Sequence, residues 1–262
     1  MANIKNIIKN KALGLLQHYP RVAFIHVPKC AGVSVYSSIY SALYPSFFKA
    51  TSLTEHIDLS ASSKSAQLLS IDMMRAREVV LVNHLDNPFK RFVTGHCYAN
   101  PIVVEEYNDR WKFVTVLRDP VDRFISEYVY NRFKESKWAS VNVGIEEYLQ
   151  SSAAQAKGLT LSSYFSGLSI NELLHLNERD VIDISINNLR NFESIGFVDD
   201  MAGWNERLSK KIGRKVHFSN KNTSPNQSVF IDIKSNDVLL SKINNLCSLD
   251  SQLYAAARTE FS

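Results

Sequence analysis

The chain has 262 residues, of which 45% are hydrophobic and 21% are charged, and its formal net charge at pH 7 is +4. A chain of this length and apolar content can bury a sizeable core as a single domain. The small positive charge suits an anionic ligand, but it is far too weak to indicate a nucleic-acid partner.

Residues 1–20 are expected to form an N-terminal helical extension. Its apolar stretches are short and are interrupted by Lys5, Lys9 and Lys11, so we expect neither a signal peptide nor a membrane-spanning segment. The cysteines of the chain are few, odd in number and spaced like no metal site. This pattern predicts a reducing compartment and no bound metal.

The next segment has the pattern of an anion-binding loop. Val22–Val27 is a short apolar, β-branched run typical of a buried strand, and the apolar spacing over 35–43 predicts a helix. A loop that leads into a helix directs free backbone N–H groups at one point, which attracts phosphate or sulfate. Lys29 adds a positive charge, Gly32 permits close approach of a ligand, and Ser34 offers a hydroxyl donor.

An ATP-type phosphate loop is the first alternative for this segment. That motif has two glycines, with a lysine after the second and then a Ser or Thr that holds magnesium. Here Lys29 precedes Gly32, which is the only glycine of the loop. The order of the residues therefore argues against an ATP-type site.

Between residues 44 and 94 the pattern is less regular. Residues 44–78 are expected to form irregular structure and a helix, and Val79–Val82 and Phe92–Thr94 are predicted as strands. The charged residues of this region are expected to form a solvated face, with a groove for an acidic saccharide as the alternative. These residues are Arg75, Arg77, Lys90 and Arg91.

A second strand-to-helix junction follows. Phe113–Leu117 has the pattern of a buried strand, and Asp119 suits the N-cap of a helix that has Pro120 at its first position. Arg118 at the strand end and Ser126 on the helix are placed to grip one phosphate between a guanidinium and a hydroxyl. Because a nucleotide hydrolase would carry a magnesium-binding aspartate where Arg118 stands, a metal-free anion is predicted.

The rest of the chain is predicted to be mainly helical. Residues 135–190 contain stretches with helical spacing, Ser194–Val198 is predicted as the last strand, and a helix is expected from Asp199 to about Leu208. Residues 220–225 have the composition of a polar loop, and 237–261 that of one long amphipathic helix.

Four segments of the sequence resemble the sulfotransferases. His26–Ser34 is similar to their 5′-phosphosulfate loop, and Leu117–Tyr128 is similar to their 3′-phosphate segment. Thr94–His96 resembles a Gly-His motif, and Leu249–Tyr254 resembles the C-terminal helix signature, of the carbohydrate sulfotransferase branch that includes heparan sulfate 2-O-sulfotransferase. The resemblance thus extends over nearly the whole chain.

This resemblance implies the fold and the cosubstrate. The expected fold is α/β, a three-layer sandwich around a central, mostly parallel sheet, which is the P-loop-like sulfotransferase fold. We expect one domain over residues 1–262, in which the helical segment 135–190 shapes the acceptor pocket. The cosubstrate would be 3′-phosphoadenosine 5′-phosphosulfate (PAPS), its product PAP, and no metal would be needed.

The resemblance also assigns roles to individual residues. Lys29 would be catalytic, offsetting the charge that develops on the leaving phosphate, and the loop amides would hold the 5′-phosphate. Arg118 and Ser126 would hold the 3′-phosphate. The loop at 220–225 would close over the nucleotide, with a plain surface turn as the alternative. The complete set of expected cosubstrate-binding residues is Lys29, Cys30, Ala31, Gly32, Val33, Ser34, Arg118, Ser126, Asn220 and Lys221.

A general base must also take the proton of the acceptor. His96 is the leading candidate, because Gly95 lets the chain turn at a strand end and ligands bind at the carboxyl ends of parallel strands. His84, at the end of the Val79–Val82 run, is the alternative base. Thr94 stands where the heparan 2-O enzymes carry a second histidine, so this chain departs from their acceptor side.

The expected function is therefore transfer of the sulfuryl group of PAPS to a hydroxyl group, with a saccharide as the acceptor. The alternatives are a P-loop-type nucleotide-dependent phosphotransferase and a catalytically silent PAP-binding protein. Animal members of the family resemble Golgi membrane proteins, whereas we expect no such anchor in residues 1–20 of this chain. We therefore expect a cytoplasmic enzyme or the trimmed lumenal domain of a Golgi protein.

Overall fold

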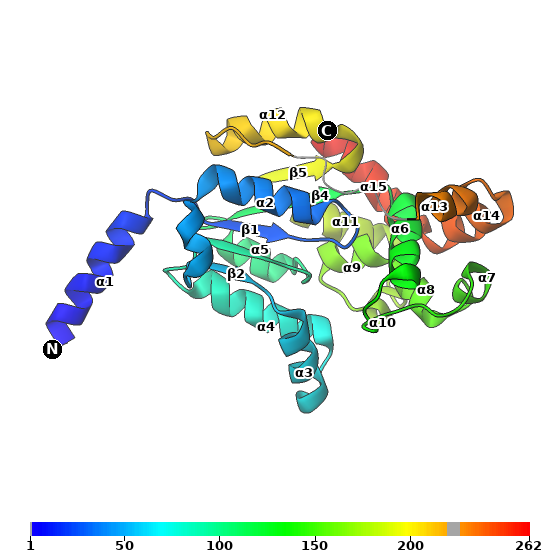
Figure 1. Cartoon of the computed structure of the whole chain (residues 1–262), viewed down its shortest axis with the longest axis horizontal. Coiled ribbons are helices and arrows are strands. Elements are labelled where there is room, and N and C mark those ends of the chain that lie inside the picture. Colours follow the sequence, from blue (N-terminus) through cyan, green and yellow to red (C-terminus); the bar gives the residue numbers. More distant parts are fainter. Residues whose placement is uncertain (1, 219–225) are drawn as a thin grey trace.

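The computed structural model, which describes residues 2–218 and 226–262, is built on a sheet whose strands all run parallel (Figure 1). The strand order is β2-β3-β1-β4-β5, so the first strand lies in the middle of the sheet. The strands are β1 (Val22–Ile25), β2 (Thr54–His56), β3 (Phe92–Gly95), β4 (Lys112–Leu117) and β5 (Ser194–Phe197). This confirms the α/β fold with a central parallel sheet.

Helices make up most of the remaining chain. Before β4 they are α1 (Ala2–Leu16), α2 (Gly32–Leu43), α3 (Leu59–Leu69), α4 (Met73–Asp86) and α5 (Pro101–Tyr107). Between β4 and β5 lie α6 (Pro120–Phe133), α7 (Ile145–Tyr148), α8 (Ser152–Gly158), α9 (Thr160–Ser166), α10 (Ile170–Leu173) and α11 (Glu178–Leu189). After β5 come α12 (Met201–Ile212), α13 (Gln227–Lys234), α14 (Asp237–Leu246) and α15 (Ser248–Phe261), and short 3₁₀ helices span Ser46–Ala50 and Val198–Asp200.

Helices cover both faces of the sheet. The chain moves from β1 to one edge through α2 and later from β3 to the other side of β1 through α5. Right-handed crossovers in opposite directions place their helices on opposite faces, and Figure 1 shows α2 in front of the sheet and the fainter α5 behind it. Strands β1, β3, β4 and β5 are almost completely buried between these layers, as their largely apolar sequences predict.

The strand predicted at Val79–Val82 is wrong, because these residues lie inside α4. Asp72 caps this helix by accepting hydrogen bonds from the backbone N–H groups of Met74 and Arg75. Leu81 and Leu85 face the core, one turn apart, while Val79 is 68% exposed. The run of β-branched residues is therefore outweighed by a capped, amphipathic helix that extends on both sides of it.

Two smaller expectations also differ from the structure. The predicted helix over 237–261 is divided at Cys247 into α14 and α15. The three-residue edge strand β2 is absent from the expectations, because its sequence, Thr-Glu-His, is polar and only half-buried. The strands predicted at Phe92–Thr94, Phe113–Leu117 and Ser194–Val198 are confirmed within one residue at their ends.

The sheet fixes where a site can form. The chain leaves β1 toward one edge and crosses to the other side before β4, so the carboxyl ends of β1 and β4 border the crevice of the topological switch point. The register pairs Ile25 of β1 with Thr115 of β4, and the Thr115 hydroxyl donates to the Ile25 carbonyl at 2.9 Å. The two segments singled out in the sequence leave the sheet at this crevice.

Candidate active site

The loop after β1 ends in a helix whose first N–H groups are uncapped. Ala31 occupies the N-cap position of α2 without a side-chain hydrogen bond to the helix. Lys29 and Ala31 both adopt left-handed backbone conformations, with φ of 65° and 55°. Such conformations are costly for residues other than glycine and are typical of functional loops. Uncapped N–H groups and the positive end of the helix dipole suit a phosphate or sulfate.

Lys29 is half-buried beside this helix start. Its Nζ atom lies 3.9 Å from the ring centroid of Tyr130 on α6, a cation–π arrangement that orients the ammonium group. Burial lowers the pKa of Lys29, and the carboxylate of Glu127 acts in the opposite direction. A partly desolvated ammonium group at this position is well suited to stabilise an anion.

Gly32 is required by a close contact with His26. A Cβ atom at position 32 would collide with the imidazole ring of His26. The ring of His26 occupies the space that a side chain at position 32 would need. The loop glycine of the sequence motif therefore serves the packing of the histidine against the start of α2.

Arg118 brings the second motif to the first. It follows β4 directly, and its Nη1 atom donates a hydrogen bond to the Lys29 carbonyl at 3.4 Å. The Asp119 side chain caps α6 by accepting from the backbone N–H of Asp122 at 2.9 Å, as the sequence predicts. Ser126 lies on the second turn of α6 and is 7% exposed.

His96 is fixed by contacts to its ring and to its backbone. Its Nδ1 atom lies 2.6 Å from the carbonyl oxygen of His26, and the two imidazole rings are 4.2 Å apart. The carbonyl of His96 accepts a hydrogen bond from Arg77 Nη1 at 3.1 Å, and Arg77 also donates from Nε to Ser62 at 3.0 Å. Because a carbonyl can only accept, Nδ1 carries the proton and Nε2 keeps its lone pair.

The environment keeps both histidines uncharged at neutral pH. Burial lowers the pKa of His26 to about 3, with smaller contributions from His96 and His56. Burial also lowers the pKa of His96 to about 4, although its hydrogen bond to His26 acts in the opposite direction. A neutral His96 is available to accept a proton.

A buried ionic network of Arg123, Glu127 and Lys157 lies near Lys29 of the anion loop. Glu127 accepts from Arg123 at 2.6 Å and pairs with Lys157 at 2.7 Å. Arg123 is fully buried and also donates to the Lys157 carbonyl. These two cations hold the pKa of Glu127 at about 2 although burial acts to raise it. The network joins α6 to α8.

The C-terminal motif acts through Asp250. This fully buried carboxylate on α15 accepts from the backbone N–H groups of Leu161 and Ser162 at 2.7 and 2.8 Å, and from the Ser162 hydroxyl at 2.7 Å. It thereby caps α9, whose own N-cap residue, Leu159, offers no side-chain bond. The resemblance of Leu249–Tyr254 to a family signature thus coincides with a structural contact.

The remaining residues predicted for the site do not lie in it as expected or are not described. His84 lies on α4 near Lys90 and Glu55, whose ion pair flanks the start of β3, whereas His96 follows its end. Cys30 is buried, and burial raises the pKa of its thiol to about 12, so only its backbone is available to a ligand. Asn220 and Lys221 lie outside the described residues.

Sequence reasoning missed His26 and Arg77 as parts of this site. His26 stands at a strand end, as His96 does, which was a usable signal. Arg77, Lys90 and Arg91 were expected in a solvated face or a groove, but each is 5–6% exposed. They donate to backbone carbonyls or, in the case of Lys90, pair with Glu55. Except for Pro88, the partner of Arg91, these partners lie at least 19 residues away in sequence.

An uncapped helix start at the switch point of a parallel sheet is typical of α/β proteins that bind nucleotide-like anions. Residues 23–175, more than half of the chain, match the sulfotransferase domain family. The chain belongs to this family and is a PAPS-dependent sulfotransferase. The match decides against the ATP-type phosphotransferase.

Two further comparisons were made. The chain is similar to the solved structure of mouse sulfotransferase SULT7A1 complexed with PAP, with 15% identity and a TM-score of 0.38, over 92% of this chain and 70% of that one. This likeness adds nothing to the family assignment. No curated protein matches the chain.

A membrane-spanning helix and a cluster of metal-binding residues are both absent from residues 2–218 and 226–262. None of the helices described there is long and apolar enough to cross a membrane. No group of three or more His, Cys, Asp or Glu residues in this part of the chain is arranged to hold a metal ion. Metal independence remains a prediction.

Proposed function

We propose that this sulfotransferase moves the sulfuryl group of PAPS to a hydroxyl group of a saccharide, with His96 as the general base. The observation that carries the proposal is the 2.6 Å contact of His96 Nδ1 with the His26 carbonyl. It leaves Nε2 unprotonated, and the His26 ring in turn contacts the start of α2 at Gly32. The base and the anion loop are therefore joined through one residue.

The residues of the loop fit the charged end of PAPS. The uncapped amides of Gly32, Val33 and Ser34 suit its 5′-phosphate, and Lys29 suits the oxygen that becomes negative as the phosphate leaves. An electrostatic contact of this kind contributes roughly 3–4 kcal/mol to a transition state, by analogy with one oxyanion-hole donor. PAPS supplies the activated sulfuryl group.

Arg118 and Ser126 are proposed to hold the 3′-phosphate. Arg118 lies at the strand end beside the Lys29 carbonyl, and Ser126 on the helix that begins next to it. Asn220 and Lys221 remain part of the proposal through their sequence alone. The helix that follows them, α13, returns to this region, because the Phe230 ring centroid lies 5.7 Å from the Arg118 guanidinium carbon.

The chemistry at the acceptor then balances. The acceptor hydroxyl gives its proton to His96 Nε2, its oxygen forms a bond to sulfur, and the bond from sulfur to the phosphate oxygen breaks. The electron pair of that bond stays on PAP, beside Lys29. The His96 imidazolium formed in this way is stabilised at Nδ1 by the His26 carbonyl.

Polar groups on α4 and on the segment that follows His96 favour a saccharide over an apolar acceptor. On α4, Glu78 accepts hydrogen bonds from Arg75 at 2.8 Å and from Asn100 at 2.9 Å. Arg75 also pairs with Glu172 at 3.1 Å and lies 5.7 Å from the ring of Tyr98. Alternating polar groups and an aromatic ring suit the hydroxyls and the apolar face of a sugar.

The test is transfer of labelled sulfuryl from PAPS to a panel of acceptors. The panel contains a neutral polysaccharide, an acidic polysaccharide, an aromatic alcohol and a long-chain alcohol. Incorporation into a polysaccharide that is lost in Lys29→Ala and His96→Ala is the expected result. Incorporation only into the aromatic or aliphatic alcohol would overturn the saccharide assignment, and no transfer from PAPS to any acceptor, with PAP still bound, would favour a silent PAP-binding protein.

A further inference from the structure

Helix α1 presents an apolar face that the rest of the chain does not cover. Ile4, Ile7, Ile8 and Leu15 are 63%, 59%, 63% and 66% exposed. Their spacing of three, four and seven residues places them on one side of the helix, here named the α1 face. Figure 1 shows α1 projecting away from the sheet, with its free end distant from the other elements.

The base of the helix is nevertheless held firmly. The Leu16 carbonyl accepts a hydrogen bond from Arg91 Nε at 2.9 Å, and Arg91 is 5% exposed. The Leu16 side chain packs against the main core. Just beyond, the Tyr44 hydroxyl donates to the Pro20 carbonyl at 2.7 Å. The α1 face therefore belongs to a projecting helix whose C-terminal end is held against the core.

The charge around this face is of one sign. Residues 1–54 contain no Asp or Glu, and their basic residues are Lys5, Lys9, Lys11, Arg21, Lys29 and Lys49. Three of these lysines belong to α1. An exposed apolar stripe on a helix that also carries lysines is typical of helices that lie in the interface of an anionic membrane.

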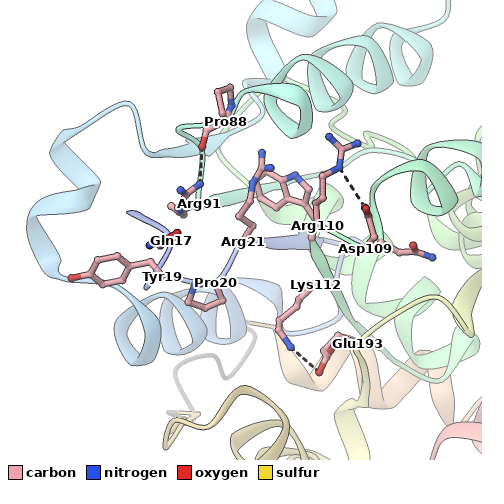
Figure 2. A pocket seen from close by; sticks show the side chains of 12 residues that line it. Gln17, Tyr19, Pro20, Arg21, Pro88, Arg91, Asp109, Arg110, Lys112 and Glu193 are labelled. Carbon is pink, nitrogen blue, oxygen red and sulfur yellow. Dashed lines mark hydrogen bonds and ion pairs between the residues drawn. The ribbon is translucent and has the colours of Figure 1, made fainter. Parts of the chain in front are cut away.

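A basic hollow opens at the foot of the helix. It has a volume of about 480 Å³ and is lined by residues that join α1 to β1 and β4. Figure 2 shows its four basic residues around the opening: Arg21, Arg91, Arg110 and Lys112. Asp109 and Glu193 oppose them through ion pairs with Arg110 and Lys112, and Glu106 lies 3.5 Å from Arg110.

Arg21 and Arg91 of the hollow form no ion pair with any acid among the described residues. The pKa of Arg21 is lowered to about 10, first by burial and then by the positive charges of Arg91 and Arg110. The positive field thus extends from the lysines of α1 onto the body of the protein. An anionic surface is the partner that complements both.

We propose that α1 binds an anionic lipid bilayer, with the α1 face inserted among the acyl chains and the basic hollow turned to the headgroups. Lys11 favours a bilayer over a second copy of the chain, because it lies within the α1 face, one turn from Ile7, Ile8 and Leu15. At a membrane its ammonium group reaches back to the headgroups. In a paired helix two such charges would be buried together.

This arrangement does not depend on the proposed chemistry. α1 precedes the amino end of β1, whereas Lys29 and Arg118 follow the carboxyl ends of β1 and β4. Strands that run parallel have these ends at opposite edges of the sheet. A bilayer at α1 therefore leaves the PAPS site open, and membrane binding and PAP binding are separable.

The test is co-sedimentation of the full chain with vesicles. One set contains phosphatidylglycerol and phosphatidylcholine in equal parts, and the other phosphatidylcholine alone. The wild-type chain is expected to bind the anionic vesicles at least tenfold more strongly, and added salt should reduce that binding. Equal binding to both vesicles, or binding to neither, would overturn the proposal.

Substitutions identify the surface. Ile4→Asn with Ile8→Asn should reduce the partition coefficient by at least tenfold, and Lys9→Gln with Lys11→Gln by about fivefold for each lysine. The matched controls are Val238→Asn with Leu68→Asn, and Lys210→Gln with Lys242→Gln, all at exposed positions away from α1. Equal losses in controls and test variants would contradict the assignment of the surface.

The oligomeric state in solution tests whether a second copy of the chain, rather than a bilayer, covers the α1 face. In the absence of lipid, sedimentation equilibrium of the wild-type chain is expected to give a monomer that Ile4→Asn with Ile8→Asn does not change. A dimer that dissociates in this variant would show that a second copy covers the α1 face. PAP binding by each variant, measured in parallel, is expected to equal that of the wild type and shows that the fold is intact.

Discussion

The Nδ1 atom of His96 lies 2.6 Å from the carbonyl oxygen of His26, which joins the residue after β3 to the residue after β1. The neighbouring strands are in register, with Ile25 opposite Gly95, so the two histidines leave the sheet side by side. One backbone oxygen therefore sets the tautomer of the proposed base. This contact also connects that base to the anion loop at Gly32.

Replacing the proposed base should separate turnover from binding. For His96→Gln we expect kcat to fall roughly 10²- to 10⁴-fold, the range for loss of a general base, while the affinity for PAP stays within about twofold. His84→Gln, near Lys90 and Glu55 on α4, is the control and should retain wild-type kcat. A loss of PAP affinity without a comparable loss of kcat would remove His96 from the role of base.

The buried histidines should make stability depend on pH. The pKa of His26 is about 3 in the folded protein, below its ordinary value of 6.5, so the unfolded chain binds more protons between these values. Stability is therefore complete above pH 6.5 and is lost as the pH falls toward 3. One such group changes the free energy of unfolding by about 1.4 kcal/mol per pH unit.

Denaturant unfolding at several pH values measures this slope. Between pH 6 and 5, the free energy of unfolding of His26→Gln should fall less steeply than that of the wild type. The difference in slope should be about 1.4 kcal/mol per pH unit, which corresponds to one proton. His175→Gln, at an exposed position, provides the control for removal of a histidine. Parallel curves for His26→Gln and the wild type would show that His26 does not carry the effect.

Gly32 should not tolerate even one methyl group. Gly32→Ala places a Cβ in the ring of His26, and we expect a loss of about 1–3 kcal/mol in stability together with weaker PAP binding. Gly144→Ala, where the space is open, is the matched control. Adding His26→Ala to Gly32→Ala should restore part of the stability, and strictly additive losses would argue that the two residues are not in contact.

The buried carboxylate of Glu127 should be among the most sensitive positions. Glu127→Gln leaves the fully buried Arg123 without its anionic partner, and breaking such a pair costs about 3–5 kcal/mol. Glu206→Gln, at an exposed position on α12, is the control. The pKa of Glu127, about 2, implies that its contribution is present above about pH 4.5 and is lost as the pH falls toward 2. Wild-type thermal stability in Glu127→Gln would contradict this.

The parts of the fold that the sequence predicted are those with local signals. β1 and β4 are short apolar runs with turn residues behind them, and the N-cap at Asp119 is visible from residue types alone. The run at Val79–Val82 misled because its β-branched residues lie within a longer helix with a cap at Asp72. Local composition was enough to predict β1, β4 and the cap at Asp119, whereas the structure of Val79–Val82 depends on the residues around it.

The contacts that complete the site depend on tertiary structure. The partners of His96 are a carbonyl after another strand and, through Arg77, a helix that the sequence predicted as a strand. Asp250 caps a helix 88 residues away in sequence. Residue types give no hint of such pairings, because each requires that the sheet order and the helix faces are already known.

Thermal unfolding with PAP and with AMP at matched concentrations probes the 3′-phosphate site that we propose at Arg118. PAP should stabilise the wild-type chain by roughly 2.7 kcal/mol at a hundredfold excess over its Kd, and AMP, which lacks the 3′-phosphate, by much less. In Arg118→Ala the affinity for PAP should fall about 10- to 100-fold, toward that for AMP. Equal stabilisation of the wild type by PAP and AMP would show that the chain has no 3′-phosphate site. An unchanged preference for PAP in Arg118→Ala would show that Arg118 does not form it.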